Sequence, residues 1–565
     1  MNQLIEYHLR LISTSAATGY FGCVPVEEPG IDAGLVLLRE RPYDDFLRQY
    51  LLSTLAAMET DMCRGFIETH ADSEDSVVAA LVCEFCDIVG QPIPAQLAGR
   101  LPRLQKASSL LYVRALPMPD RQLHHQWIAL FEANLRRHRP LLAPRETGLP
   151  MLYDQMERPD GGNGGRIETL YSAAMQKRRD DQRPPPEETA ALAFEKLQSL
   201  NVLEGEEARH AASLSPIAFL RRWRLQRRVF SGRNRYSLSG IQTSYGKGLS
   251  PEAARASCLM EIVERVSSFA AVENDRLPDH AANHHLIRAP FEELRTGGTA
   301  TLNPNRMALE VPYSTGTPLY WMTAADRFGR SVQVPVQSVF LFSNLDEVSL
   351  CSSLGSTGLA SGNSLAEAKV SALLEVIERD ADAVAPYQDN ACFALYCDNP
   401  YLTPLFEAYR TAGIAVRFQE ITTEFGVPCY RAFVVETNGN IVRATGAHLD
   451  GRKAVMSALT ETTYPFPGGP PSADAPAATT RVKFEDLPNF DTNSSAANLE
   501  ILETLLSDRG YEPVYVDLTR ADLNMPVVKA LVPGLEWMAD FDRFSRVPAR
   551  LWANYLSQSM KGATA

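Results

Sequence analysis

A pattern of one serine, two glutamates and one arginine, S-x-x-x-E-x-x-E-R, occurs twice in the chain. Its residues are Ser257, Glu261, Glu264 and Arg265 in the first copy, and Ser371, Glu375, Glu378 and Arg379 in the second. Positions i, i+4, i+7 and i+8 lie on one face of an α-helix. The intervening residues are apolar in both copies, so the pattern predicts two buried helices, each with one narrow polar stripe. Two copies in similar settings indicate an internal duplication.

Four carboxylates on two such helices are suited to metal chemistry. Buried neighbouring carboxylates are unstable unless cations neutralise them, and the two arginines cannot balance four negative charges. Oxygen ligands without nearby cysteine or histidine favour Mg²⁺, which phosphate oxygens usually complete. We therefore predict a Mg²⁺–nucleotide site on Glu261, Glu264, Glu375 and Glu378. The alternative is a pair of structural helices whose glutamates and arginines form salt bridges.

The usual phosphate-binding loops are absent from the sequence. The glycine-rich run at residues 240–248 is one residue longer than a Walker A loop, and Gly248 stands where Ser or Thr should bind the metal. Residues 246–248 are interpreted as a turn leading into the first acidic helix, with Pro251 and Glu252 in its opening turn.

Composition and the positions of glycine and proline predict how the chain is divided into domains. At 565 residues, two or three domains are expected. We predict a mainly helical N-terminal domain at residues 1–150 and a Gly/Pro-rich linker at 151–185. Residues 186–550, where strand-like runs alternate with helices, are predicted to form an α/β (α+β) domain, followed by a C-terminal tail at 551–565.

Within these segments, particular elements are expected. Helical spacing predicts helices at residues 123–137 and 186–200, the second opened by proline and acidic residues. Residues 332–342 and 429–435 are predicted strands, and the Pro/Gly-rich residues 465–480 a mobile loop.

Charge and segment composition exclude some classes of protein. The net charge of −13 argues against a general nucleic-acid binder. The N-terminus lacks the basic start and apolar run of a signal peptide, and no apolar stretch approaches the ~18 residues of a membrane span. We expect a cytoplasmic protein without membrane or nucleic-acid partners.

Two further features have competing interpretations. Cys83 and Cys86 form a lone C-x-x-C, interpreted as buried core thiols; a redox pair or half of a zinc site is the alternative. Residues 220–235 contain seven arginines, interpreted as the solvated face of an edge strand. The alternative is a surface for an acidic peptide or a phosphate-rich partner.

Three stretches resemble the signatures of the YcaO family. Residues 245–265 and 358–381, which contain the two acidic patterns, resemble its first and second motifs, and residues 525–536 are similar to its closing strand. The resemblance implies a YcaO fold with internal pseudo-two-fold duplication and ATP bound with Mg²⁺ between the halves. It also implies phosphorylation of a peptide backbone amide, followed by attack of a nucleophile to give an azoline, a thioamide or an amidine.

Matching the motifs residue by residue implies further site residues. The four glutamates would hold Mg²⁺ against the triphosphate. Asn363 and Glu367 match further nucleotide and metal contacts, Arg379 matches a phosphate-binding arginine, and Ser257 and Ser371 match the motif serines.

A hydroxyl residue and a basic residue near the start of the family domain also contact the nucleotide. Thr189 fits the hydroxyl, while Lys177, Arg179 and Arg183 compete for the basic role. No catalytic nucleophile on the protein is implied, and we assign none.

Two departures from the family pattern matter. After Glu461, Tyr464 and Phe466 replace the usual Gln and Arg, so another basic residue must supply that phosphate contact or turnover is altered. The chain also lacks the proline-rich ending common in azoline-forming members, which disfavours that product.

Three function classes therefore stay open. The first is an ATP-dependent enzyme that modifies a peptide or protein. The second is an ATP-binding accessory factor that assists another enzyme, such as a ribosomal-protein methylthiotransferase, and the third is a non-catalytic scaffold. The resemblance implies a homodimer, and a TfuA-like or leader-binding protein is an expected partner.

Overall fold

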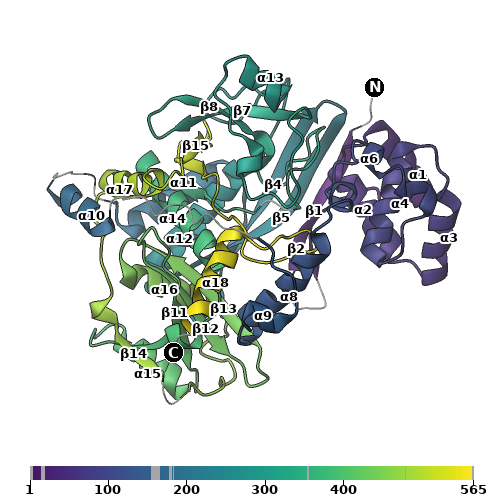
Figure 1. The fold of residues 1–565 in the computed structure, drawn as a ribbon. Coiled ribbons are helices and arrows are strands. Elements are labelled where there is room, and N and C mark those ends of the chain that lie inside the picture. The colour runs from purple at the N-terminus through teal and green to yellow at the C-terminus, as the bar shows by residue number, and fades with distance from the viewer. Residues whose placement is uncertain are drawn as a thin grey trace.

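The computed structural model describes residues 4–13, 19–153, 166–176, 181, 183–352, 355–476 and 479–562. These residues form a mixed α/β structure with three β-sheets and helices packed around and between them (Figure 1). The mixed α/β class is as predicted.

The first sheet joins the N-terminal strands to a long hairpin, in the order β2-β1-β5-β4-β3. Its strands are β1 (Ile5–Ser13), β2 (Gly19–Pro25), β3 (Leu203–Arg209), β4 (Ile217–Ser231) and β5 (Asn234–Gly248). β1 runs parallel to β5, with Tyr7 opposite Leu238. The prediction of helix is therefore wrong for residues 5–13 and 19–25, because β2 pairs with β1 and β1 pairs with a strand far along the chain that no local pattern reveals.

The other two sheets lie in the second half of the chain. The second has the order β13-β12-β11-β10-β14, and the third has β6-β7-β15-β16-β9 with β8 added on β7. The strands of the second are β10 (Cys392–Tyr396), β11 (Val416–Glu420), β12 (Cys429–Val435), β13 (Ile441–Ala447) and β14 (Thr480–Lys483). Those of the third are β6 (Ile287–Pro290), β7 (Pro318–Asp326), β8 (Ser331–Pro335), β9 (Leu359–Ser361), β15 (Val514–Asp517) and β16 (Val527–Leu531).

Helices dominate the N-terminal part of the chain after β2. They are α1 (Ile31–Glu40), α2 (Asp45–Ala56), α3 (Thr60–His70), α4 (Ser76–Val89), α5 (Ala95–Ala98), α6 (Leu101–Leu104), α7 (Tyr112–Ala115), α8 (Arg121–Arg137) and α9 (Pro144–Thr147). The remaining helices are α10 (Ile167–Met175), α11 (Pro186–Ser199), α12 (Pro251–Ser268), α13 (Phe291–Thr296), α14 (Leu365–Val384), α15 (Thr403–Thr411), α16 (Gly451–Glu461), α17 (Ser495–Ser507) and α18 (Ala549–Gly562). The predicted helices at 123–137 and 186–200 are confirmed as α8 and α11.

The two acidic patterns lie on α12 and α14, near the centre of the molecule (Figure 1). Both helices start at a serine N-cap: Ser250 accepts the amide of Ala253 at 3.2 Å, and Ser364 accepts that of Glu367 at 3.1 Å. Such caps satisfy backbone donors that a helix start leaves unpaired. α12 packs on β5 in the first sheet and α14 follows β9 of the third, so the internal duplication stays a prediction.

Several local expectations need correction. Residues 246–248 are the end of β5 and not a turn. Of the predicted strand 332–342, only the part up to Pro335 is β8, and a 3₁₀ turn at Val336–Ser338 follows. The predicted strand 429–435 is confirmed as β12.

The arginine-rich residues of β4 are not on an edge strand, because β4 lies between β3 and β5. Arg227 donates to the carbonyl oxygens of Phe269 and Val266 at the end of α12, while Arg222 and Arg228 are exposed. Cys83 and Cys86 are fully buried on α4, which confirms that they are core thiols.

The segment predicted as a C-terminal tail is largely helix α18, which packs against α8. Trp127 of α8 contacts Trp552 and Tyr555 of α18 edge-on or tilted, with ring centroids 4.6 and 5.8 Å apart. The N-terminal helices and the end of the chain therefore share one hydrophobic cluster. The predicted linker 151–185 contains α10, and the domain boundaries stay predictions.

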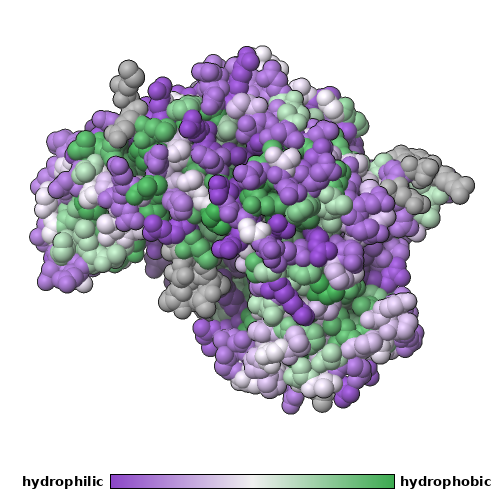
Figure 2. Space-filling model, turned by 180° about the vertical axis from the view of Figure 1, so that it is seen from behind, coloured by the Kyte–Doolittle hydropathy of each residue, from purple (hydrophilic) through white to green (hydrophobic). Residues whose placement is uncertain are grey.

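Among the described helices, none has the length and apolar composition that crossing a membrane requires. On the face shown in Figure 2, hydrophobic residues form scattered patches among hydrophilic ones.

Candidate nucleotide and metal site

A cavity of about 1290 Å³ lies between α12, β9 and α14. All four polar-stripe residues of α12 line it, namely Ser257, Glu261, Glu264 and Arg265. From α14, Ser371 and Glu375 line it, and Arg183 and Thr189 contribute from the start of α11 and the segment before it. The structure thus brings most of the sequence-predicted site residues to one cavity.

Glu264 and Glu375 both line this cavity and are named the inner carboxylates. Burial raises the pKa of Glu264 to about 8, and the charges of Glu375 and Glu261 add to the rise. Burial likewise raises the pKa of Glu375 to about 7, against the opposing effect of Arg379 and Arg265. Two acidic groups with a raised pKa in one cavity indicate that nearby cations compensate their negative charges only in part.

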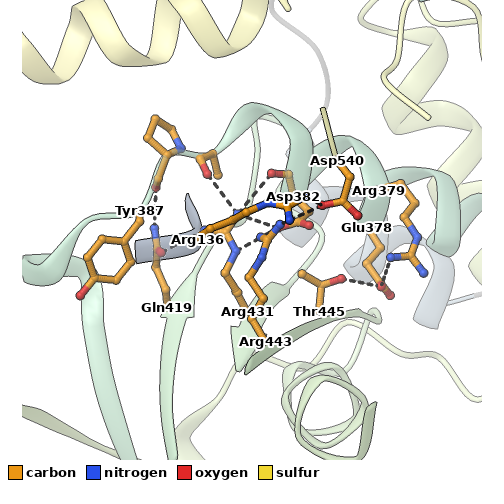
Figure 3. A network of polar contacts seen from close by, with 12 residues as sticks. Arg136, Glu378, Arg379, Asp382, Tyr387, Gln419, Arg431, Arg443, Thr445 and Asp540 are labelled. Atoms are coloured by element: carbon orange, nitrogen blue, oxygen red, sulfur yellow. Dashed lines mark hydrogen bonds and ion pairs between the residues drawn. The ribbon is translucent and has the colours of Figure 1, made fainter. Parts of the chain in front are cut away.

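Glu261 and Glu378, the outer carboxylates, are each held by a strand, and of the two Glu261 lines the cavity and Glu378 does not. Tyr245 of β5 donates its backbone amide to Glu261 Oε2 at 3.0 Å. Thr445 Oγ1 donates to Glu378 Oε1 at 2.8 Å (Figure 3), and the amide of Ala447, also on β13, donates to Glu378 Oε2 at 3.2 Å. Burial raises the pKa of both outer carboxyls as well.

Among the described residues, the cations near these carboxylates include the two arginines of the pattern and the lysine Lys529. Arg265 pairs with its neighbour Glu264 and lies 3.6 Å from Glu261. Arg379 lies 4.0 Å from Glu378 with 43% of its side chain exposed, and it is not among the residues that line the cavity.

Lys529 of β16 is the site residue that sequence reasoning missed. It is 2% exposed, and its ammonium donates to the carbonyl oxygen of Thr357 at 2.8 Å. Burial lowers its pKa to about 8, against the charges of Glu375 and Glu264. A single lysine inside the apolar run Val-Val-Lys-Ala-Leu was the signal, because a lone charge in a buried strand needs a partner.

A chain of hydrogen bonds joins three other predicted residues beside the cavity. Thr189 Oγ1 donates to Asn363 Oδ1 at 3.1 Å, and Asn363 Nδ2 donates to both oxygens of Glu367 at 3.1 and 3.2 Å. Arg183 pairs with Glu367 at 2.8 Å. Its competitors for the basic role, Lys177 and Arg179, lie outside the described residues.

The residues that depart from the family pattern do not reach the cavity. Tyr464 is 1% exposed and donates to the carbonyl oxygen of Pro470 at 3.0 Å, and Phe466 packs edge-on against Tyr409. Lys247 instead pairs with Glu461 at 2.5 Å, and both line the cavity. Lys247 therefore places a cation on the cavity wall.

The residues present fit Mg²⁺ held together with phosphate. Over the described ranges, no group of three or more acidic, histidine or cysteine side chains is assembled tightly enough to cage a metal. Mg²⁺ is usually bound by one or two carboxylates and completed by phosphate oxygens, and the inner carboxylates lie beside a cavity large enough for a nucleotide. Burial raises the pKa of both, and a cation bound beside them would favour their charged forms.

Comparison with known proteins points to one family. The chain matches the profile described as YcaO cyclodehydratase, ATP- and Mg²⁺-binding, over residues 245–465 and 469–536. An uncharacterized protein of Methanothermobacter thermautotrophicus is 29% identical over 358 residues, 56% of this chain and 88% of that protein. An uncharacterized protein in the tfuA 3' region of Rhizobium leguminosarum bv. trifolii is 28% identical over 250 residues, 40% of this chain and 55% of that protein.

Solved structures with similar folds are more distant. One is a heterocyclase in complex with substrate and cofactor, at 17% identity and a TM-score of 0.49, covering 86% of this chain and 72% of that one. Another is YcaO from Methanopyrus kandleri bound with AMPPCP and Mg²⁺, at 22% identity and a TM-score of 0.44, covering 63% and 93%.

Proposed function

This chain belongs to the YcaO family, and we propose that it uses Mg-ATP to phosphorylate the oxygen of a peptide or protein backbone amide. Its cofactors are ATP and Mg²⁺. The phosphorylated amide carbon is then open to a nucleophile, and the amide oxygen leaves with phosphate. One observation carries the proposal: Glu264 and Glu375, both with raised pKa, line a single nucleotide-sized cavity.

The carboxylates of the two acidic helices would hold Mg²⁺, which when bound neutralises the charge that develops during phosphoryl transfer. We assign this role to Glu261, Glu264, Glu375 and Glu378. The chain's own part is positioning and charge compensation, so it needs no covalent nucleophile.

The remaining candidates would contact the nucleotide. Arg379 is exposed enough to bind a phosphate, and Ser257 and Ser371 place small polar side chains on the cavity wall. The chain Thr189–Asn363–Glu367 fixes the start of α14, with Arg183 as the basic residue beside it.

An ATP-binding accessory role is the second candidate. It is favoured by the buried Tyr464 and by the partly buried Phe466, which packs on Tyr409, because neither side chain lines the cavity to contact a phosphate. In that case the site binds Mg-ATP, and another protein, such as a methylthiotransferase, performs the modification.

The partners of the chain belong to the proposal as well. A TfuA-like protein is the favoured one, because a relative at 28% identity is described as lying in a tfuA 3' region. We also propose a homodimer, as the resemblance implies.

Calorimetric titration with a non-hydrolysable ATP analogue and Mg²⁺ tests the site. The wild type should bind, and Glu261→Ala and Glu378→Ala should not. Peptides with ¹⁸O in their backbone carbonyls then test the chemistry, because amide phosphorylation transfers ¹⁸O into released phosphate. ATP binding without any ¹⁸O transfer would favour the accessory role, and absence of binding by the wild type would contradict both.

A further inference from the structure

The second half of α14 is held by a buried ion-pair network (Figure 3). Asp382 lies one helical turn after Glu378, on the same face. Its Oδ1 accepts Nε and Nη2 of Arg431 at 2.9 and 2.6 Å, and Nη1 of Arg443 at 2.8 Å. Asp382 is 6% exposed and Arg431 1%, so these are fully desolvated charges whose geometry matters.

The network continues to Glu378 along β13. Arg443 and Thr445 are two residues apart on this strand and therefore share a face. Arg443 binds Asp382 while Thr445 binds Glu378. Two residues along β13 are thus matched to one turn of α14. This match defines the register of the helix on the strand.

Arg443 is not needed merely to neutralise Asp382. Arg431 already gives that carboxylate two hydrogen bonds and a full positive charge. The second nitrogen of Arg443 points to Asp540, 3.8 Å away, whose side chain is 77% exposed (Figure 3). What Arg443 adds is a link between α14 and the strand that carries Thr445.

The segment just after α14 is fixed as well. Tyr387 donates its amide to Asn134 Oδ1 at 2.8 Å, and Asn134 Nδ2 donates to the carbonyl oxygen of Tyr387 at 3.2 Å. The ring of His138 stacks on that of Tyr387 at 3.5 Å. α8 therefore fixes the segment just beyond α14, while the contacts on β13 hold the part of the helix that carries Glu378 and Asp382.

We propose that Asp382 and Arg443 are positioning residues for Glu378: their ion pair sets the register that brings Thr445 and Ala447 to this carboxylate. The inference rests on the proposed function, in which Glu378 binds Mg²⁺. Groups that hold a ligating carboxylate in place typically contribute about 10- to 100-fold to metal affinity.

The test is calorimetric: Mg²⁺ affinity at a fixed concentration of the ATP analogue, and analogue affinity without Mg²⁺, with folding checked by circular dichroism. For Arg443→Met and Asp382→Asn we expect Mg²⁺ affinity to fall about 10- to 100-fold, with a smaller change in metal-free binding. Arg443→Lys, which keeps the charge, should recover part of the loss. Arg417→Met is the matched control, because Arg417 lies on β11 of the same sheet and pairs with Asp389 at 3.7 Å.

If the Arg443→Met variant folds and keeps the wild-type Mg²⁺ affinity, the inference is overturned. If Arg443→Met does not fold, Thr445→Val decides, since it removes one hydroxyl: an unchanged Mg²⁺ affinity overturns the inference, and about a tenfold loss supports it. An equal loss in Arg417→Met would also overturn it. A wild type that binds no Mg-nucleotide contradicts the proposed function instead, so the two failures are distinguishable.

Discussion

Thr189 donates a hydrogen bond to Asn363, 174 residues further along the chain, with 3.1 Å between Oγ1 and Oδ1. Thr189 lies on α11 and Asn363 precedes the second acidic helix, so this contact joins two segments of the predicted nucleotide site. Asn363 in turn orients Glu367.

Thr189→Val should therefore weaken binding of the Mg-nucleotide analogue. The change keeps the shape but removes the donor, leaving Asn363 Oδ1 without this partner, at a cost of about 1 kcal/mol in stability. Calorimetry and urea unfolding measure the two effects. Thr54→Val is the control, because Thr54 bonds Tyr50 on α2, away from the site. If both variants bind the nucleotide analogue with equal affinity, Thr189 does not contribute to the site.

Stability of the nucleotide-free protein should fall as pH rises from about 5 to 8. The pKa values of Glu264 and Glu375 are raised from 4.5 to about 8 and about 7, so the folded state binds more protons than the unfolded chain in this window. The free energy of unfolding then decreases with pH. Glu264→Gln removes one of the two groups and should flatten the curve, measured by thermal unfolding from pH 5 to 8.5.

Affinity for the Mg-nucleotide analogue should rise with pH over the same window, because the carboxylates must lose protons to bind metal. Glu310→Gln separates the two effects. Burial raises the pKa of Glu310 too, but this residue lies outside the site. The variant should change the stability curve and leave the pH dependence of binding intact; if binding loses its pH dependence, the inner carboxylates are not its cause.

Lys529→Met should destabilise the nucleotide-free protein at pH 7.5 by about 3 kcal/mol, because it removes a buried cation next to two buried carboxyls. Added Mg-nucleotide should restore part of the loss. Urea unfolding checks both statements. Lys369→Met is the matched control: Lys369 lies on α14 with its ammonium 4.4 Å from the ring centre of Tyr515, and its loss should cost about 1 kcal/mol or less. Similar losses in both variants would show that Lys529 does not compensate the site.

Gly246→Ala should lower stability by about 3 kcal/mol and weaken nucleotide binding together. An added Cβ at Gly246 would collide with the carbonyl oxygen of Ala254 and the amide of Cys258, pushing α12 off β5. Gly30→Ala is the control, since an added Cβ there meets no atom within 4 Å. Thermal unfolding measures the stability, and calorimetry measures the nucleotide affinity. Wild-type values of both in Gly246→Ala would mean that β5 and α12 can move apart without cost.

The sequence by itself determined the two acidic helices and the chemistry they carry. Their stripes follow from local helical spacing, and Pro251 and Glu252 predicted the opening turn of the first, so no distant contact was needed to predict them. The same holds for α8, α11 and β12, whose periodicity is local.

Only the tertiary structure decided what surrounds those helices. Lys529, on β16 of the third sheet, lies where the charges of Glu375 and Glu264 act on its pKa, Thr445 of the second sheet donates to Glu378, and β1 pairs with β5 across more than two hundred residues. Each of these contacts joins segments that share no local sequence pattern. It forms because folding buries a charge or a strand edge, and only the folded chain brings a partner to that charge or edge.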